Sequence, residues 1–169
     1  MTKRIFATAI AAAVIATSLP TAGAANALTA VPTRTKGQAV YVGSTRVYPT
    51  GYNINDNNYF KLRDVAGAVN GTAKQFQTYW DESKQAIELF RGVPYSSSVS
   101  GAAGRYGDTY GTTSTAKLYC DGERKSVSAY TINDYTYYKL RDLAKLLDMG
   151  VTWEEGSATI GINTAKSYQ

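Results

Sequence analysis

The sequence contains few combinations of side chains that could perform catalysis. It has no histidine and a single cysteine, Cys120, which excludes Ser-His-Asp and Cys-His sites and zinc sites built on histidine. Two acidic pairs, Asp81-Glu82 and Glu154-Glu155, are the remaining groups that could hydrolyse a glycosidic bond. Each pair directly follows a tryptophan near the expected end of a strand, so we interpret both as turns. We therefore expect no catalytic residue, no metal site and no cofactor.

Two arginine-aspartate pairs are candidate binding residues. Arg63-Asp64 and Arg141-Asp142 each place a fork-shaped guanidinium beside a carboxylate, an arrangement that can hold an anionic ligand. The alternative, which we favour, is that arginine braces a nearby loop or carboxylate while aspartate stabilises the start of a helix. The presence of the pair at two places in the chain is compatible with either interpretation.

Tyrosine is the unusual component of the composition, with 14 residues. Tyr59, Tyr137 and Tyr138 are candidate binding residues, because exposed tyrosine rings combine an apolar face with a polar edge and can stack on the rings of a glycan. The favoured alternative is that these tyrosines build half-buried sheet faces, where tyrosine is common.

A repeat explains why these features occur twice. Residues 52–66 match residues 130–144 at a displacement of 78, with ten of fifteen positions identical. After this motif the displacement falls to 73, because a loop in the first copy is longer, and the match then continues to the second tryptophan and beyond. Cys120 aligns with Val42, so we expect it to be a small core residue rather than one half of an intermolecular disulfide.

Each copy is expected to contain short strands and one helix. Residues 40–42 and 118–120 begin a hairpin whose second strand ends near Ile54 or Ile132, and the Asn-Asp turn that follows tolerates positive φ. Apolar residues at i, i+3, i+4 and i+7 from Leu62 and from Leu140 predict one amphipathic helix per copy. The predicted fold class is α+β, with two small repeats, each a mostly antiparallel curled sheet packed on one short helix. One such unit buries little surface, so we expect the two copies to pack on each other.

The N-terminal residues resemble a secretory signal, with Lys3 and Arg4 before an apolar stretch and a small-x-small cleavage motif at residues 25–27. Removal of this segment would lower the formal charge from +5 to +3. We expect no transmembrane segment in the mature chain, because no later stretch is long and apolar enough. The predicted organisation is a signal peptide at 1–27, an N-terminal lead at 28–38, repeat 1 at 39–95, a weakly ordered Gly/Ser/Thr-rich linker at 96–116 and repeat 2 at 117–169.

The repeated motif Tyr-x-Ile-Asn-Asp-x-x-Tyr-[Phe/Tyr]-Lys-Leu-Arg-Asp-[Leu/Val]-Ala, followed by Trp-[Asp/Glu] and a closing tyrosine, carries a family resemblance. It resembles the stalk-type module named for the N-terminal domain of copper amine oxidases, which is common in exported proteins of Gram-positive bacteria. The resemblance covers both copies and implies an α+β fold and a non-catalytic role. Asp56 and Asp134 stand where the family usually has a turn glycine.

We therefore expect a secreted, extracellular interaction module that associates with the cell wall or with an exported partner protein. The alternative is a carboxylate-dependent enzyme that acts on glycans or on the wall. The mild positive charge is compatible with an anionic wall polymer, but it lacks the clustered lysines and arginines of nucleic-acid binders, so we expect no nucleic acid as partner.

Overall fold

The computed structural model describes residues 27–97 and 107–169. The predicted signal peptide lies outside these ranges except for its last position. Strands dominate the described part of the chain, and the two helices are short. Within those ranges there is no helix with the length and apolar character that a membrane span requires.

The order of elements in the first half of the described chain is repeated in the second half. The first copy comprises β1 (Leu28–Pro32), β2 (Ala39–Val42), β3 (Thr45–Val47), β4 (Gly51–Ile54), β5 (Asn57–Lys61), α1 (Leu62–Ala68), β6 (Phe76–Asp81) and β7 (Ala86–Arg91). The second comprises β8 (Thr109–Thr113), β9 (Lys117–Cys120), β10 (Glu123–Lys125), β11 (Ala129–Ile132), β12 (Tyr135–Lys139), α2 (Leu140–Leu147), β13 (Gly150–Glu154) and β14 (Thr159–Asn163).

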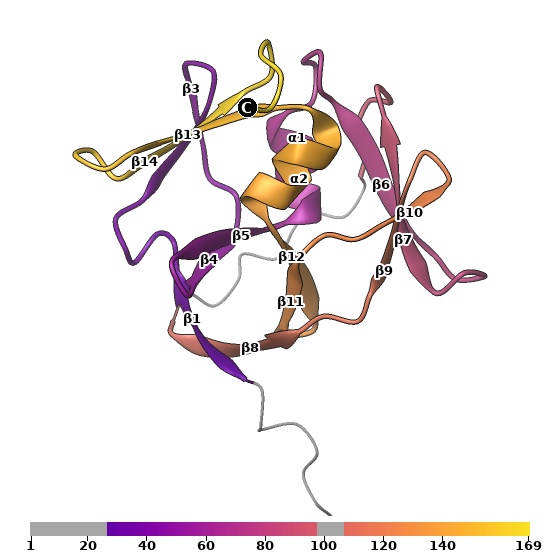
Figure 1. Ribbon diagram of the computed structural model, residues 1–169, viewed down its shortest axis with the longest axis horizontal. Helices are drawn as coiled ribbons and strands as arrows, with labels where there is room; N and C mark the ends of the chain where they lie inside the picture. Colours follow the sequence, from indigo (N-terminus) through magenta and orange to yellow (C-terminus); the bar gives the residue numbers. More distant parts are fainter. Residues whose placement is uncertain (1–26, 98–106) are drawn as a thin grey trace, which may run out of the picture.

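Six strands, three from each copy, form a closed barrel in the order β1-β4-β5-β12-β11-β8. The copies meet at two antiparallel seams, β5 with β12 and β1 with β8. Each seam joins a strand to its own counterpart in the other copy, so the copies are related by an approximate twofold axis. The barrel lies below the two helices in Figure 1. Its interior is filled by one apolar cluster: Ala30, Tyr52, Ile54, Tyr59, Ile132 and Tyr137.

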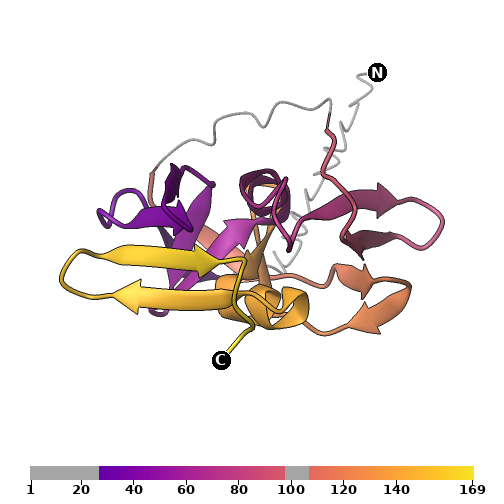
Figure 2. The same ribbon diagram turned by 90° about the horizontal axis from the view of Figure 1, so that it is seen from above.

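Two four-stranded sheets flank the helices, and each sheet contains a hairpin from each copy. In one sheet β14 lies parallel to β2, in the order β13-β14-β2-β3. In the other β7 lies parallel to β9, in the order β10-β9-β7-β6. Figures 1 and 2 show the two sheets on opposite sides of the molecule with both helices between them. The larger hydrophobic core lies here and includes residues of both helices and both sheets.

The predicted fold class is therefore wrong. The chain is mostly β and forms one interlocked barrel with two flanking sheets, not two repeats that each pack a sheet on a helix. The expected packing between copies is confirmed in a stronger form, because the barrel and both flanking sheets are each assembled from strands of both copies. A lone copy would bury only about 60% of its unfolded surface, and shared sheets remove that limitation.

Two strands lie in segments that the sequence did not predict as strands. β1 lies in the expected lead at 28–38, and β8 lies in the expected linker at 96–116, whose residues 98–106 are outside the described residues. The prediction of a weakly ordered linker is wrong for β8, which pairs with both β1 and β11. The only buried residue of β8 is Gly111. A Cβ atom there would lie 3.1 Å from Cγ1 of Ile132 and 3.3 Å from Cδ1 of Ile54, so a larger residue would have to displace these side chains by a few tenths of an ångström.

The local predictions agree better with the structure. The Asn-Asp turns have positive φ in both copies, at 47° and 58° for Asn55 and Asp56 and at 48° and 65° for Asn133 and Asp134. Both helices lie where the periodicity placed them. One detail differs, because the expected second strand of each hairpin is divided in two, β3 and β4 in the first copy and β10 and β11 in the second. Cys120 is buried in the core, as predicted, with a free thiol.

Candidate functional site between the two copies

The aspartates of the two arginine-aspartate pairs brace loops. A carboxylate oxygen of Asp64 accepts a hydrogen bond from the backbone N–H of Thr50 at 2.7 Å. The corresponding oxygen of Asp142 accepts one from the N–H of Ser128 at 3.1 Å. Each carboxylate thus fixes the loop before a barrel strand to the first turn of the following helix. These two aspartates are structural residues in both copies.

The arginines of these pairs are exposed, and neither forms an ion pair or side-chain hydrogen bond with another residue of the described ranges. The favoured interpretation that arginine braces a loop or carboxylate is therefore wrong for these contacts, because the aspartates hold the loops. Arg141 lines a cavity described below, and Arg63 is not among the residues that line it. Arg63 and Arg141, which are equivalent in the repeated sequence, therefore differ in the structure, because only Arg141 lies beside this cavity.

The three candidate tyrosines are buried and cannot form an exposed platform. Tyr59 and Tyr137 lie inside the barrel, and Tyr138 lies in the larger core with 1% of its surface exposed. Burial is the main cause that raises the pKa of Tyr59, with smaller contributions from Tyr130 and Asp142. Burial alone raises the pKa of Tyr138. These tyrosines build the interior of the fold, where they are buried rather than on the half-buried sheet faces that we expected.

The acidic pairs lie at the ends of hairpins in different sheets. Asp81 accepts hydrogen bonds from the N–H and O–H of Ser83 and from the N–H of Lys84, which organises the β6–β7 turn. The Ser83 hydroxyl bond is the largest cause that lowers the pKa of Asp81. Glu154 and Glu155 lie at the β13–β14 turn, and Glu155 lines the same cavity as Arg141.

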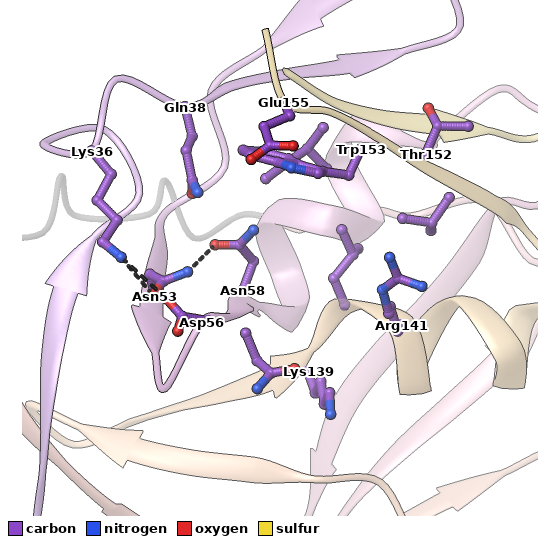
Figure 3. A pocket seen from close by; sticks show the side chains of 14 residues that line it. Lys36, Gln38, Asn53, Asp56, Asn58, Lys139, Arg141, Thr152, Trp153 and Glu155 are labelled. Atoms are coloured by element: carbon purple, nitrogen blue, oxygen red, sulfur yellow. Dashed lines mark hydrogen bonds and ion pairs between the residues drawn. The ribbon is translucent and has the colours of Figure 1, made fainter. Parts of the chain in front are cut away.

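This cavity has a volume of about 460 Å³ and lies between the two copies, where it brings Arg141 and Glu155 together. Its size lies within the range of small-molecule sites. One wall comes from the β1–β2 loop and the β4–β5 hairpin of the first copy, and the other comes from β12, α2, β13 and β14 of the second. The side chains around it are drawn in Figure 3. They are Lys36, Gln38, Asn53, Asp56, Asn57, Asn58, Lys139, Leu140, Arg141, Val151, Thr152, Trp153, Glu155 and Ile160.

A hydrogen-bonded chain of side chains organises the wall from the first copy. Lys36 donates to the amide oxygen of Asn53 at 2.9 Å and lies 3.8 Å from the carboxylate of Asp56. Asn53 in turn donates to the amide oxygen of Asn58 at 3.1 Å. Because the oxygen of Asn58 is used in this way, its amide nitrogen is directed toward the cavity, as Figure 3 shows. The wall therefore presents a positioned donor.

The wall from the second copy combines an aromatic ring with charged groups. Val151 and Trp153 alternate along β13, so their side chains lie on one side of the strand, and Glu155 follows in the β13–β14 turn. Trp153 is 42% exposed, which is high for a tryptophan in a strand. Arg141 and Lys139 lie on the other side of the cavity from Trp153 and Glu155 in Figure 3. An apolar ring faced by amides and charges can hold a ligand that has both an apolar face and polar edges.

The approximate twofold axis relates this cavity to a position in the other half of the molecule that differs from it in one contact. There, the ring of Tyr135 covers Lys61, whose Nζ lies 3.7 Å from the ring centroid. Tyr135 corresponds to Asn57 and Lys61 corresponds to Lys139. Lys61 is 8% exposed, whereas Lys139 is half-buried beside the open cavity. The short asparagine in place of tyrosine is one reason why the cavity is open.

The loop between the first two strands of each copy is the second difference. In the first copy, residues 33–38 connect β1 to β2 and contribute Lys36 and Gln38 to the cavity. In the second copy only residues 114–116 connect β8 to β9. The cavity thus depends on residues at which the copies differ, and sequence reasoning missed it because it concentrated on the positions that are identical. The differences Asn57/Tyr135 and Asn58/Thr136 were visible in the aligned repeats and are the signal that could have located the site.

Residues 27–97 and 107–169 contain no cluster of three or more histidine, cysteine or acidic side chains that could hold a metal ion. Comparison of the chain with protein-family models, with curated proteins and with solved structures gives no match.

Proposed function

We propose that this chain is a non-catalytic extracellular interaction module that binds a saccharide, such as a glycan of the cell wall, in the cavity between its two copies. The observation that carries the proposal is the cavity itself, in which the half-exposed ring of Trp153 faces amide and charged side chains. Sugar rings have apolar C–H faces and hydroxyl edges, which match an indole ring bordered by hydrogen-bonding groups.

The organisation of the polar groups supports this proposal. The amide nitrogen of Asn58 is fixed by its bond from Asn53, so it loses little side-chain freedom when a ligand binds. Glu155 provides acceptors on the opposite side of the cavity. A saccharide hydroxyl can donate to a carboxylate and accept from an amide, which makes both groups suitable partners.

An extracellular location and wall association remain predictions from the N-terminal residues and from the resemblance to stalk-type modules of exported proteins. The interlocked fold is compatible with a binding role, because a site built from both copies exists only when the whole pair is folded. An exported partner protein is the alternative ligand, and it would be indicated if the chain binds whole cells but not purified wall.

The residue at the equivalent position of the second copy, Tyr135, suggests a substitution that closes the cavity. We expect Asn57→Tyr to place a ring over Lys139, as Tyr135 covers Lys61, and to reduce co-sedimentation with purified cell wall at least about tenfold. The control is Tyr135→Phe, which alters the equivalent position outside the cavity, keeps a ring over Lys61 and should leave wall binding unchanged. Thermal unfolding of both variants shows whether the fold is intact.

Wall binding that Asn57→Tyr leaves unchanged would contradict the proposed site. Trp153→Ala provides an independent check, because it removes the ring without filling the cavity, and the equivalent Trp80→Ala is its control. The absence of wall co-sedimentation for the unmodified chain at low and moderate salt would contradict wall association itself.

A second candidate function, hydrolysis of a glycan by two carboxylates, is favoured by one observation, the presence of Asp56 and Glu155 in the same cavity. This function predicts release of reducing ends from purified wall, with loss of that release in Asp56→Asn and Glu155→Gln. Binding without release of reducing ends would exclude it and support a non-catalytic module.

A further inference from the structure

We propose that the saccharide bound in the cavity is acidic, and that Arg141 and Lys139 bind its anionic group, a carboxylate or a phosphate. The inference rests on the proposed function and adds the chemical class of the ligand. It follows from which charged groups around the cavity already have partners and which do not.

The charges of the first copy's wall are largely satisfied within the protein. Lys36 lies beside Asp56 and donates to Asn53, so its charge is partly balanced by a neighbouring carboxylate. On the other wall, Arg141, Lys139 and Glu155 have no ion pair or side-chain hydrogen bond with any residue in the described ranges. Among the described residues, the second copy's wall therefore has two cations and one carboxylate without a charged partner, which is an excess of one positive charge.

The equivalent lysine of the first copy, Lys61, already has a partner within the protein. Lys61 is covered by the ring of Tyr135 at 3.7 Å, a cation–π contact that accounts for its charge. Lys139 has Asn57 at the corresponding position, and an amide side chain provides no such ring. The substitution thus uncovers a cation and opens a cavity beside it at the same place.

The two sides of the cavity suggest how the ligand is oriented. Trp153 and Glu155 lie on one side, where they can contact a ring face and a hydroxyl group. Arg141 and Lys139 lie on the other side, where the fork of the guanidinium can bind two oxygens of a carboxylate or phosphate. A ring with hydroxyls at one edge and an anionic group at another fits both sides together.

Calorimetric titration of the whole chain tests this inference with two pairs of probes. The first pair is trigalacturonate and its methyl ester, and the second is glucose 6-phosphate and glucose, so that carboxylate and phosphate are distinguished. We expect the anionic member of at least one pair to bind about tenfold more tightly than its neutral partner. Raising the salt concentration should weaken binding of the anionic member only.

Arg141→Gln and Lys139→Gln identify the residues responsible. Each should reduce affinity for the anionic probe about five- to tenfold and leave affinity for the neutral partner unchanged. Arg63→Gln is the matched control, because Arg63 is the equivalent arginine of the first copy and is exposed outside the cavity. Its binding constants should equal those of the unmodified chain.

Two results would overturn the inference and leave the proposed function intact, and a third would overturn both. Equal affinity for the charged and neutral members of both pairs, with binding still lost in Asn57→Tyr, would show a saccharide site without charge recognition and would leave the proposed function intact. Wall binding that is lost in Asn57→Tyr but is unaffected by Arg141→Gln and by added salt would also show a saccharide site without charge recognition. Failure of the unmodified chain to bind either the probes or the wall would contradict the proposed function as well.

Discussion

The ring of Tyr52 lies edge-on to the ring of Tyr137, with centroids 5.2 Å apart and planes at 86°. Tyr59 and Tyr130 form the same contact, at 5.0 Å and 89°. Each pair joins one tyrosine of the first copy to one of the second, and the two pairs exchange places when the copies are exchanged. Edge-to-face aromatic pairs stabilise a core beyond the area they bury. The interior of the barrel is therefore an interface between the copies.

The first prediction is that neither copy folds alone. Residues 27–97 and 107–169, produced as separate fragments, should each lack cooperative unfolding, because each lacks half of the barrel and half of both flanking sheets. Mixed in equal amounts, they should recover the near-ultraviolet circular dichroism of the tyrosine pairs. A single fragment that melts cooperatively at the temperature of the intact chain would contradict this.

The second prediction concerns a glycine that close packing requires in one copy only. A Cβ atom on Gly51 would lie 2.4 Å from ring atoms of Phe60 and 3.0 Å from the carbonyl oxygen of Tyr59. Gly51→Ala should therefore reduce the free energy of unfolding by about 1–3 kcal/mol, as overpacking does in other cores. Urea denaturation followed by circular dichroism measures this.

The second copy provides the control, because Ala129 occupies the corresponding position opposite Tyr138. Its methyl group is already accommodated, so Ala129→Gly should cost only about 1 kcal/mol, mainly through the greater freedom of glycine in the unfolded chain. Equal losses in the two variants would show that the contact with Phe60 relaxes readily.

The sequence predicted the local elements because their determinants are local. The positive φ of Asn55 and Asp56 follows from the turn chemistry of asparagine and aspartate, and the helix that begins at Leu62 follows from apolar periodicity. The pairing of strands did not follow, because a lone copy and an interlocked pair have the same local pattern. β8 shows this most clearly, since Thr109–Thr113 has one buried residue, a glycine, and is a strand because β1 and β11 lie beside it.

The candidate site was difficult to predict for a related reason. Residues identical in both copies, such as Asp64 and Tyr59, maintain the shared fold, and they supplied most of the candidates. The cavity is defined by differences, such as Asn57 against Tyr135, and by the length of the β1–β2 loop. Of the predicted binding residues, only Arg141 lines it.

The third prediction concerns the buried hydroxyl of Tyr138, which has no hydrogen-bond partner among the described residues. An unsatisfied buried polar group lowers stability, so Tyr138→Phe should leave the free energy of unfolding unchanged or raise it by about 1 kcal/mol. Phe60 at the equivalent position shows that the core accepts phenylalanine there. A clear loss of stability on chemical denaturation would indicate that the hydroxyl has a partner.

Tyr138 also predicts a dependence on alkaline pH. Burial raises its pKa in the folded protein above the ordinary value of 10.0. The folded state therefore prefers the protonated ring, and this contribution is complete below pH 10 and decreases as pH rises through the folded pKa. Thermal unfolding between pH 9 and 12 should show a decline that is smaller in Tyr138→Phe, with a remainder from Tyr59, whose pKa is also raised. Identical declines in both proteins would contradict this role of Tyr138.

The fourth prediction concerns Asp148, which joins a loop of the first copy to the C-terminal residues of the second. Its carboxylate lies 2.8 Å from Nζ of Lys74 and accepts hydrogen bonds from the N–H of Tyr168 and the hydroxyl of Ser167. These contacts, the Lys74 bond first, hold its pKa below the ordinary value of 3.8. The stability they provide is therefore complete above about pH 4 and is lost as pH falls through the lower, folded pKa.

Asp148→Asn separates this effect from the conformation of the backbone. Asp148 has a φ of 53°, and asparagine adopts the left-handed region at least as readily as aspartate, so the backbone should be retained. The variant should be less stable than the unmodified chain at pH 6 and should lose less stability between pH 4 and 2. The ion pair is exposed, so we expect the difference at pH 6 to be small and to shrink further at high salt. Melting temperatures measured across this pH range at two salt concentrations provide the comparison, and parallel pH profiles for the two proteins would show that the charge of Asp148 does not support the contact between copies.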